Sequence, residues 1–524
     1  MSGCWMLVLH SHLPFVKHPE FDYFLEEHWL YEAISETYLP LLMNMKKLEE
    51  EGVPFRVTVS VTPPLADMLS DNMLMQRFEK YLDRLIELAN KEKDRTAHDR
   101  AQNRVAWMYL ERFERLREFY HGFLGRSVLN GYKYFMNKGS LEIITCGFTH
   151  GFLPLMNGDS AVRAQIELAV KSHEKKFGTP PKGIWLPECA YYAGLEKILA
   201  DYGIRYFFVD THGILYSKPR PRYGVYAPVY TSNGVAAFGR DYYSSKQVWS
   251  SKEGYPGDTC YRDFYRDIGY DLDTEYIAPY ISPDGTRVFT GMKYHKITGN
   301  SDHKDIYDPE AAKAKTAEHA AHFVAEREKQ IKELNEVMDR KPLVVSPYDA
   351  ELFGHWWFEG PDFLANVFRE IDKNPEITAV TPMEYLAEFP TNQMVEVNPS
   401  SWGDKGYYDV WLNSGNEWIY RHLHFMADAM VSLSRKYSGT KEDFLIRTLN
   451  QMARELFLAQ SSDWAFLMTT ETATEYSVRR TKEHIHNFLR LRELVDNRDF
   501  DYDFLMKLET KNSIFPEIDF RVYA

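Results

Sequence analysis

The sequence has few cysteines, and their positions exclude several kinds of site. Four occur among 524 residues, and no two have the CxxC spacing of a zinc or redox pair. Scattered single thiols are typical of proteins in a reducing compartment. We therefore expect reduced thiols and a cytoplasmic protein. The four are Cys4, Cys146, Cys189 and Cys260.

Long apolar runs and an excess of positive charge are also lacking. No stretch approaches the roughly 20 apolar residues of a membrane-spanning helix. The first apolar run breaks at His10 and has no basic flank, which predicts a first strand rather than a signal peptide. Lys and Arg number 62 against 76 Asp and Glu, a net charge of −14. Nucleic acids and anionic membranes attract basic surfaces, so we expect neither as a partner.

Aromatic residues, by contrast, are frequent. They make up 15% of the chain and include 35 Tyr and 11 Trp. Their flat faces suit the C–H surfaces of sugars, although most large aromatic side chains pack in protein cores. We expect the Tyr-rich segment 218–273 to form loops that wall a cleft, with Tyr242, Tyr243 and Trp249 facing a ligand. In that segment we also expect Arg262 and Arg266 to share a helical face and brace acidic residues.

Short apolar runs that end in polar residues alternate with amphipathic helices. Helical patterns occupy about 72–137, 161–177 and 311–337, and they return from 399 nearly to the end. Strands that alternate with helices predict an α/β fold built on a parallel barrel, with its site at the carboxyl ends of the strands. The apolar runs that predict strands are 4–9, 57–61, 141–145, 183–186, 202–209, 286–292 and 343–345.

The same patterns predict two domains. We expect a catalytic barrel at residues 1–395, interrupted by a helical insertion at about 72–137. A C-terminal helical domain follows at 396–524, where the character of the sequence changes. We expect this second domain to contribute to the cleft.

The stretch 343–361, LVVSPYDAELFGHWWFEGP, concentrates ionisable residues among aromatics. Pro347 lacks an N–H, so we expect it to end the strand that precedes it. Burial among large aromatics can shift the pKa of a carboxyl group, as a catalytic pocket requires. A satisfied core cluster is the alternative. The residues concerned are Asp349, Glu351, His355, Trp356, Trp357 and Glu359.

Two carboxylates stand in similar local settings. Glu188 and Asp349 each follow an apolar strand and a proline, and they are 161 residues apart, so only tertiary structure can bring them together. A retaining glycosidase uses such a pair, about 5–5.5 Å apart, with one carboxyl as the acid and the other as the nucleophile. The competing interpretation is that each carboxylate is an ion-pair partner or a helix cap.

Histidines also follow predicted strands. Alternation along the first strand places His10 and His12 on one face, and His150 follows another strand. Two such histidines could bind a metal, bind a substrate hydroxyl or cap the barrel. A metal site needs a third ligand that the spacing does not supply, so we favour substrate binding.

Five ordered segments together resemble the motifs of glycoside hydrolase family 57. The resemblance implies an incomplete seven-stranded (β/α) barrel, a helical insertion and a C-terminal helical domain. It also implies that Glu188 is the nucleophile and Asp349 the general acid/base, without a metal or organic cofactor. The segments are HSHLP (10–14), CGFTH (146–150), WLPEC (185–189), DAELFGHW (349–356) and the Trp-rich region 402–418.

Within that family the chain is most similar to the 1,4-α-glucan branching enzymes, through the segments 255–258, 261–267 and 462–464. This implies an α-1,4-glucan substrate such as amylose, starch or glycogen, and transfer of a cleaved chain to a 6-hydroxyl by double displacement. It also implies a loop at 232–247 that covers the site. The candidate substrate-binding residues are His10, His12, His150, Trp357, Trp402, Trp411, Trp418, Arg262, Asp463 and Tyr243.

Three alternatives remain at this point. An α-amylase or a 4-α-glucanotransferase could use the same scaffold. A zinc-dependent hydrolase or deacetylase could use His10 and His12 with another ligand. A non-catalytic glucan-binding protein would need only the tryptophans. We expect a monomer or a small homo-oligomer.

Overall fold

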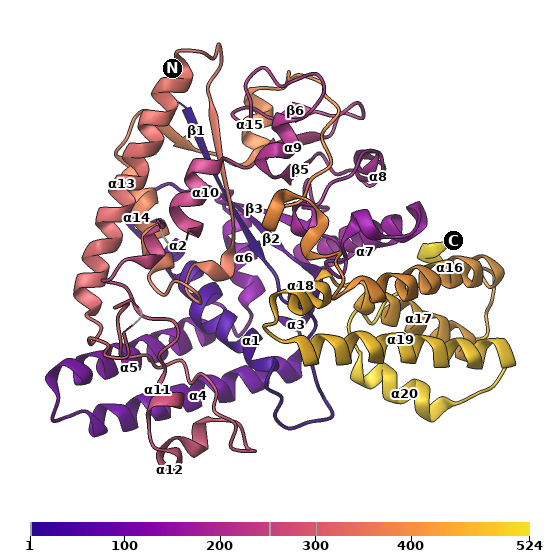
Figure 1. Cartoon of the computed structure of the whole chain (residues 1–524), viewed down its shortest axis with the longest axis horizontal. Helices are drawn as coiled ribbons and strands as arrows, with labels where there is room; N and C mark the ends of the chain where they lie inside the picture. The colour runs from indigo at the N-terminus through magenta and orange to yellow at the C-terminus, as the bar shows by residue number, and fades with distance from the viewer. Residues whose placement is uncertain (1–2, 251–252, 300) are drawn as a thin grey trace.

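A curved sheet of seven parallel strands forms the centre of the computed structural model, which describes residues 3–250, 253–299 and 301–524 (Figure 1). The strand order is β7-β5-β4-β3-β2-β1-β8; β6 (Val229–Tyr230) pairs antiparallel with β7, and β9 (Ile377–Ala379) pairs parallel with β1. This confirms the predicted incomplete barrel. The parallel strands are β1 (Gly3–Ser11), β2 (Val57–Val61), β3 (Leu141–Cys146), β4 (Gly183–Trp185), β5 (Tyr206–Val209), β7 (Ala236–Gly239) and β8 (Leu343–Asp349).

Strand β1 lies between β2 and the edge strand β8. All nine of its residues are buried, as its continuous apolar sequence predicts for a parallel strand covered on both faces. Its register sets His10 opposite Ser60 of β2 and opposite Asp349 of β8. The carboxyl end of β1 therefore holds a histidine level with a carboxylate of the neighbouring strand.

Strand β8 continues through Pro347, so the prediction that this proline ends the strand is wrong. Leu343 N donates to Tyr226 O, and Val345 O accepts from Asp241 N, so odd-numbered residues of β8 direct their backbone groups away from β1. Alternation places the Pro347 nitrogen on that same outer side. The missing N–H thus removes no bond to β1, as is usual for proline in an edge strand.

The segment 72–137 forms the expected helices, α4 (Asn72–Arg95), α5 (Arg100–His121) and α6 (Val128–Asn137). Asp71 and Asp99 begin the first two helices by accepting hydrogen bonds from backbone N–H groups of the first turn. Each helix turns an apolar face inward. In Figure 1, α4 and α5 lie together at one end of the sheet.

The C-terminal part is also helical, and it lies beside the carboxyl ends of the strands in Figure 1. Its central helix, α17 (Asp443–Ala459), is buried from Thr448 to Ala459 except at Asn450. No helix among the residues described is long and apolar enough to cross a membrane. The helices are α16 (Tyr420–Lys436), α17 (Asp443–Ala459), α18 (Ser462–Thr470), α19 (Thr474–Asn497) and α20 (Tyr502–Lys511).

Three local predictions differ from the structure. The segment 286–292 is not a strand, because the Asp267 carboxylate binds the amides of Thr290 and Gly291 and so competes with sheet pairing. The segment 232–247 is not a loop, since it contains β7 and the start of α10 (Tyr242–Trp249). The strand expected at 202–209 begins only at Tyr206, after a turn.

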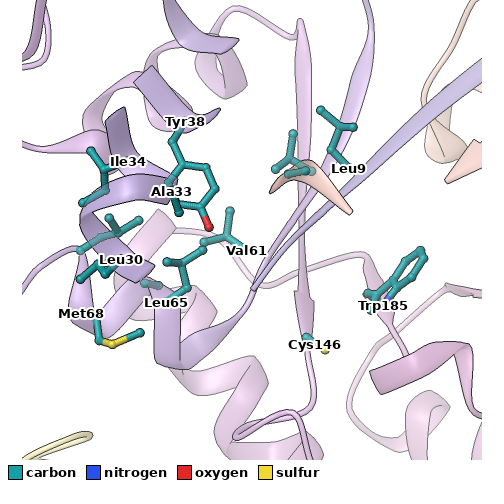
Figure 2. Packing of buried hydrophobic residues seen from close by; sticks show 14 of the residues in the cluster. Leu9, Leu30, Ala33, Ile34, Tyr38, Val61, Leu65, Met68, Cys146 and Trp185 are labelled. Carbon is teal, nitrogen blue, oxygen red and sulfur yellow. The ribbon is translucent and has the colours of Figure 1, made fainter. Parts of the chain in front are cut away.

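A dense apolar cluster lies beneath the carboxyl ends of β1, β2, β3 and β4 (Figure 2). It packs Leu9 and Val61 of the strands against α1 (Glu27–Glu32), the π-helical turn η1 (Ala33–Tyr38) and α3 (Pro63–Met68). Close packing of this kind is hard to compress, so its side chains have little room to shift. It therefore fixes the strand ends and, with them, the polar residues that follow.

Candidate active site

Glu188 lies in a tight turn directly after β4. Its backbone φ is 62°, and Cys189 and His150 have φ of 51° and 57°. Non-glycine residues in this left-handed region cost on the order of 1–3 kcal/mol each and gather at functional sites. Cys189 N donates to Leu186 O and thereby holds the turn. The strained turn directs the Glu188 side chain toward the C-terminal part of the chain.

Both carboxylate oxygens of Glu188 accept a hydrogen bond. Trp402 Nε1 donates to Oε2 over 2.8 Å, and Ser462 Oγ donates to Oε1 over 3.0 Å. Trp402 N also donates to Glu188 O over 2.9 Å. Burial raises the Glu188 pKa to about 7, against the opposing effect of the two side-chain donors. The carboxylate is thus fixed in orientation and able to ionise near neutral pH.

Asp349 ends strand β8 and is governed by burial and charge. Burial raises the Asp349 pKa well above its usual range, and the nearby charges of Glu351 and Glu188 raise it further, against Arg240. A carboxyl with a raised pKa holds its proton to higher pH than usual and is suited to act as a general acid. Two neighbouring carboxyl groups with these properties fit the acid and nucleophile of a glycosidase.

Tyr38 is a contributor that the sequence did not reveal. Its hydroxyl donates to the carboxylate of Glu351, which also accepts from His12 N over 3.2 Å. Burial raises the Glu351 pKa, against the hydrogen bond from Tyr38. Tyr38 is the last residue of the π-helical turn η1, a geometry that occurs often at functional sites but has no simple sequence period.

The three histidines predicted as substrate-binding residues do come together. His12 and His150 stack with ring centroids 3.8 Å apart, and His10 Nε2 lies 3.0 Å from His150 Nε2. His10 also stacks on Trp185 at 4.9 Å. Burial holds the pKa values of His10 and His150 well below their usual range, with the neighbouring histidines adding to the effect. These two imidazoles are therefore neutral at neutral pH.

Asp463, at the start of α18, contacts this group of histidines from the C-terminal part of the chain. Its carboxylate lies 3.0 Å from His12 Nε2 and accepts from the Ser461 hydroxyl. Burial alone would raise the Asp463 pKa, but the charge and hydrogen bond of His12, with help from His150 and Ser461, hold it below the usual range. Asp463 therefore stays ionised.

Two groups of three could in principle hold a metal ion: His10, Cys146 and His150, or His12, His150 and Asp463. All six ring nitrogens of the histidines already have a hydrogen-bonding partner, so a metal would have to displace these contacts. Burial also raises the Cys146 pKa well above its usual range, and a protonated thiol is a poor ligand. The remaining partners of the nitrogens are Ser60, Thr62 and Ser462.

The predicted tryptophan platforms differ in accessibility. Trp402 lies beside Glu188 and is 9% exposed, whereas Trp357 and Trp411 are 2% and 1% exposed. Trp411 stacks on Phe152 at 4.8 Å. Trp357 and Trp411 belong to the hydrophobic core, and sugar stacking on their rings stays a prediction. Trp418 is half-buried, with the Lys482 ammonium 5.8 Å from its ring centroid.

Arg262 is buried as well, and its contact with substrate stays a prediction. Its guanidinium donates to the Tyr109 hydroxyl over 3.2 Å and lies 4.1 Å from the Phe358 ring centroid, while its backbone N donates to Glu359 over 3.0 Å. Arg262 therefore braces the loop after Asp349, as the alternative prediction held, although its segment is not helical. Tyr243 lies on α10 and is 61% exposed.

The other residues of the 343–361 stretch have separate partners. His355 Nδ1 lies 2.6 Å from Glu36 Oε2, which outweighs burial and raises the His355 pKa. Trp356 is 52% exposed and stacks on Phe264 at 4.5 Å. Among these residues only Glu351 has a charge that acts strongly on Asp349.

Comparison with known families agrees with this geometry. Residues 6–398 match the model for glycosyl hydrolase family 57, and residues 422–523 match the C-terminal region of 1,4-alpha-glucan branching enzymes. The chain belongs to glycosyl hydrolase family 57. The family match ends at 398, between the sheet and the C-terminal helices, near the boundary predicted at 395.

Relatives within the family include branching enzymes and an amylase. A 1,4-alpha-glucan branching enzyme of Thermococcus kodakarensis is 35% identical over 98% of this chain and 78% of its own length. A branching enzyme structure from Pyrococcus horikoshii is 36% identical, covers 100% of this chain and 97% of its own, and has a TM-score of 0.90. The alpha-amylase AmyC structure from Thermotoga maritima is 46% identical, with a TM-score of 0.94 and coverage of 100% and 99%.

Proposed function

We propose that the chain is a retaining 1,4-α-glucan branching enzyme with Glu188 as nucleophile and Asp349 as general acid/base. The observation that carries the proposal is the contrast between two carboxyl groups of one site. Glu188 is held through both oxygens by Trp402 and Ser462, whereas burial and the charge of Glu351 raise the pKa of Asp349. The match of residues 422–523 to the branching enzyme C-terminal region supports the choice of reaction.

The reaction proceeds in two displacements. Asp349 gives its proton to the glycosidic oxygen that leaves, while ionised Glu188 attacks the anomeric carbon and forms a glucosyl ester. Asp349, now ionised, then removes the proton from the 6-hydroxyl of an acceptor glucan. The acceptor oxygen attacks the anomeric carbon, Glu188 leaves, and an α-1,6 branch results. Water as the acceptor gives hydrolysis instead.

The neutral histidines and ionised Asp463 have the chemistry of a donor-sugar site. Imidazoles that both donate and accept can exchange their present partners for sugar hydroxyls without adding charge next to Glu188. Asp463 can accept from a hydroxyl while it orients His12. We assign His10, His12, His150, Asp463 and Trp402 to this role. A cytoplasmic function in glycogen synthesis is part of the proposal, consistent with four free cysteines.

Hydrolysis is the second candidate, favoured by the 46% identity to the Thermotoga maritima amylase structure. The products distinguish the two reactions. The protein is incubated with amylose, and reducing ends are counted before and after treatment with a 1,6-specific debranching enzyme. We expect short chains to appear only after debranching. New reducing ends without releasable branches would instead establish an amylase.

A further inference from the structure

A cavity of about 870 Å³ lies apart from the catalytic carboxylates, between the segment 18–24 and helices α19 and α20. Its volume is within the roughly 300–1,000 Å³ of typical ligand sites. Aromatic and charged side chains line it together. We propose that this cavity is a second glucan-binding site, which holds a linear α-1,4-glucan segment away from the reacting bond. The inference rests on the proposed function for the identity of the ligand.

One wall of the cavity offers apolar faces. Phe21 is 49% exposed and Met506 is 54% exposed, which is unusual for large apolar residues beside a cavity. Phe24 stacks on Phe21 at 5.4 Å and on His18 at 3.6 Å, so the exposed ring is backed by other rings. A supported aromatic face of this kind fits the C–H surface of a glucose ring.

The lining also contains an arginine with unpaired nitrogens. Arg480 is 1% exposed, and its Nη1 donates to Glu483 over 3.1 Å. Its Nε and Nη2 have no hydrogen-bond partner within residues 3–250, 253–299 and 301–524. Buried donors are nearly always satisfied, so the unpaired Nε and Nη2 nitrogens of this lining residue point to acceptor oxygens supplied from outside the chain once the side chain turns toward the cavity. Sugar hydroxyls supply such acceptors.

The charges of the lining favour a neutral ligand over an anion. Lys511 lies 3.0 Å from Glu20 and also pairs with Glu483, so these charges are already balanced within the wall. An anion would meet these carboxylates and an overall charge of −14. A polyhydroxyl chain can use donors and acceptors of both kinds. The charged lining residues are Arg479, Arg480, Lys507 and Lys511 against Glu20, Glu483 and Asp503.

A short chain of contacts joins the cavity to Asp463 and His12 of the candidate active site. His18 Nε2 lies 3.2 Å from the Tyr476 hydroxyl, and the Tyr476 ring contacts Trp464 with centroids 6.0 Å apart. Trp464 follows Asp463, whose carboxylate binds His12. A polymer held in the cavity would therefore stay near the active site, where a tether raises the effective concentration of the reacting segment.

The test measures binding without turnover. In a Glu188→Gln background, retention on glycogen in affinity gel electrophoresis is compared for Phe21→Ala and the control Phe425→Ala, whose side chain is also 49% exposed. Loss of one aromatic contact of about 1 kcal/mol predicts roughly fivefold weaker binding for Phe21→Ala alone. Arg480→Lys keeps the charge but loses the fork of donors, and we expect it to weaken binding as well. Thermal unfolding confirms that each variant is folded.

The outcomes separate this inference from the proposed function. Equal retention of the Phe21 and Phe425 variants would overturn the second site, whatever reaction the enzyme catalyses. Binding of inorganic phosphate that depends on Arg480, without binding of glucan, would also overturn it in favour of an anion. With Glu188 intact, we expect Phe21→Ala to raise KM for amylose and leave turnover of maltotetraose unchanged. Absence of any glucan turnover in the unmodified chain would instead contradict the proposed function.

Discussion

The two halves of the candidate catalytic pair are built differently. Glu188 follows the three-residue strand β4, occupies a strained turn and is oriented by donors from residues 402 and 462. Asp349 ends the seven-residue strand β8 and is controlled by burial and by the charge of Glu351. A nucleophile needs a fixed direction of attack, whereas an acid needs the right proton affinity. The surroundings match these separate requirements.

Removing either carboxylate gives the largest expected effect. Without Glu188 no glucosyl ester forms, so Glu188→Gln should reduce turnover of amylose to background. Asp349→Asn should cost about 10²–10⁴-fold, the usual contribution of general acid–base catalysis. An aryl glucoside with an acidic phenol as leaving group separates the two roles, because the phenolate leaves without receiving a proton. We expect it to restore glucosyl-ester formation in Asp349→Asn but not in Glu188→Gln, as measured by the burst of phenol released.

The donors to Glu188 should come next. Trp402→Phe and Ser462→Ala each remove a hydrogen bond to a charged group, worth about 1.5–3 kcal/mol, so kcat/KM should fall roughly 10–100-fold. Both bonds lower the Glu188 pKa, and ionised Glu188 is the reactive form. Their loss should therefore move the acidic limb of the pH–rate profile to higher pH. An unchanged acidic limb would mean that neither donor acts on the nucleophile.

The charge of Glu351 should affect the pKa of the general acid Asp349 and not that of Glu188. Glu351 raises the Asp349 pKa, and protonated Asp349 is the reactive form. Glu351→Gln should lower that pKa and move the alkaline limb of the kcat/KM profile to lower pH, with the acidic limb in place. Glu359→Gln is the matched control, since Glu359 is also buried but contacts Arg262 instead. A shift of the alkaline limb in both variants would contradict a specific role for Glu351.

The smallest effect concerns stability. Burial raises the Glu188 pKa in the folded state from 4.5 to about 7, so the unfolded chain ionises first as pH rises. The side chain thus favours folding least above pH 7, by on the order of 3 kcal/mol relative to pH 4. Glu188→Gln cannot ionise, and its melting temperature should exceed that of the unmodified chain by a few degrees at pH 8. The difference should shrink toward pH 5.

Sequence patterns predicted those strands and strand-end residues that can be recognised from the neighbouring sequence alone. The continuous apolar run of β1 and the polar residues after β4 and β8 led to the barrel, and the matching local settings of Glu188 and Asp349 singled out the pair. Burial of individual tryptophans could not be predicted, because Trp357 and Trp411 look as suitable for stacking as Trp402 until their neighbours are known. Tyr38 was missed because a π-helical turn changes which residue faces the site.

The position of Pro347 has a consequence for the open seam of the barrel. On the outer side of β8, Leu343 and Val345 find backbone partners in Tyr226 and Asp241, which belong to segments flanking the opposite end of the sheet. Two residues further along, at position 347, an ordinary residue would present a buried N–H on a side of β8 where no strand is paired. Proline presents no such donor. The barrel can thus stay unclosed two residues before Asp349 without leaving a backbone amide unsatisfied.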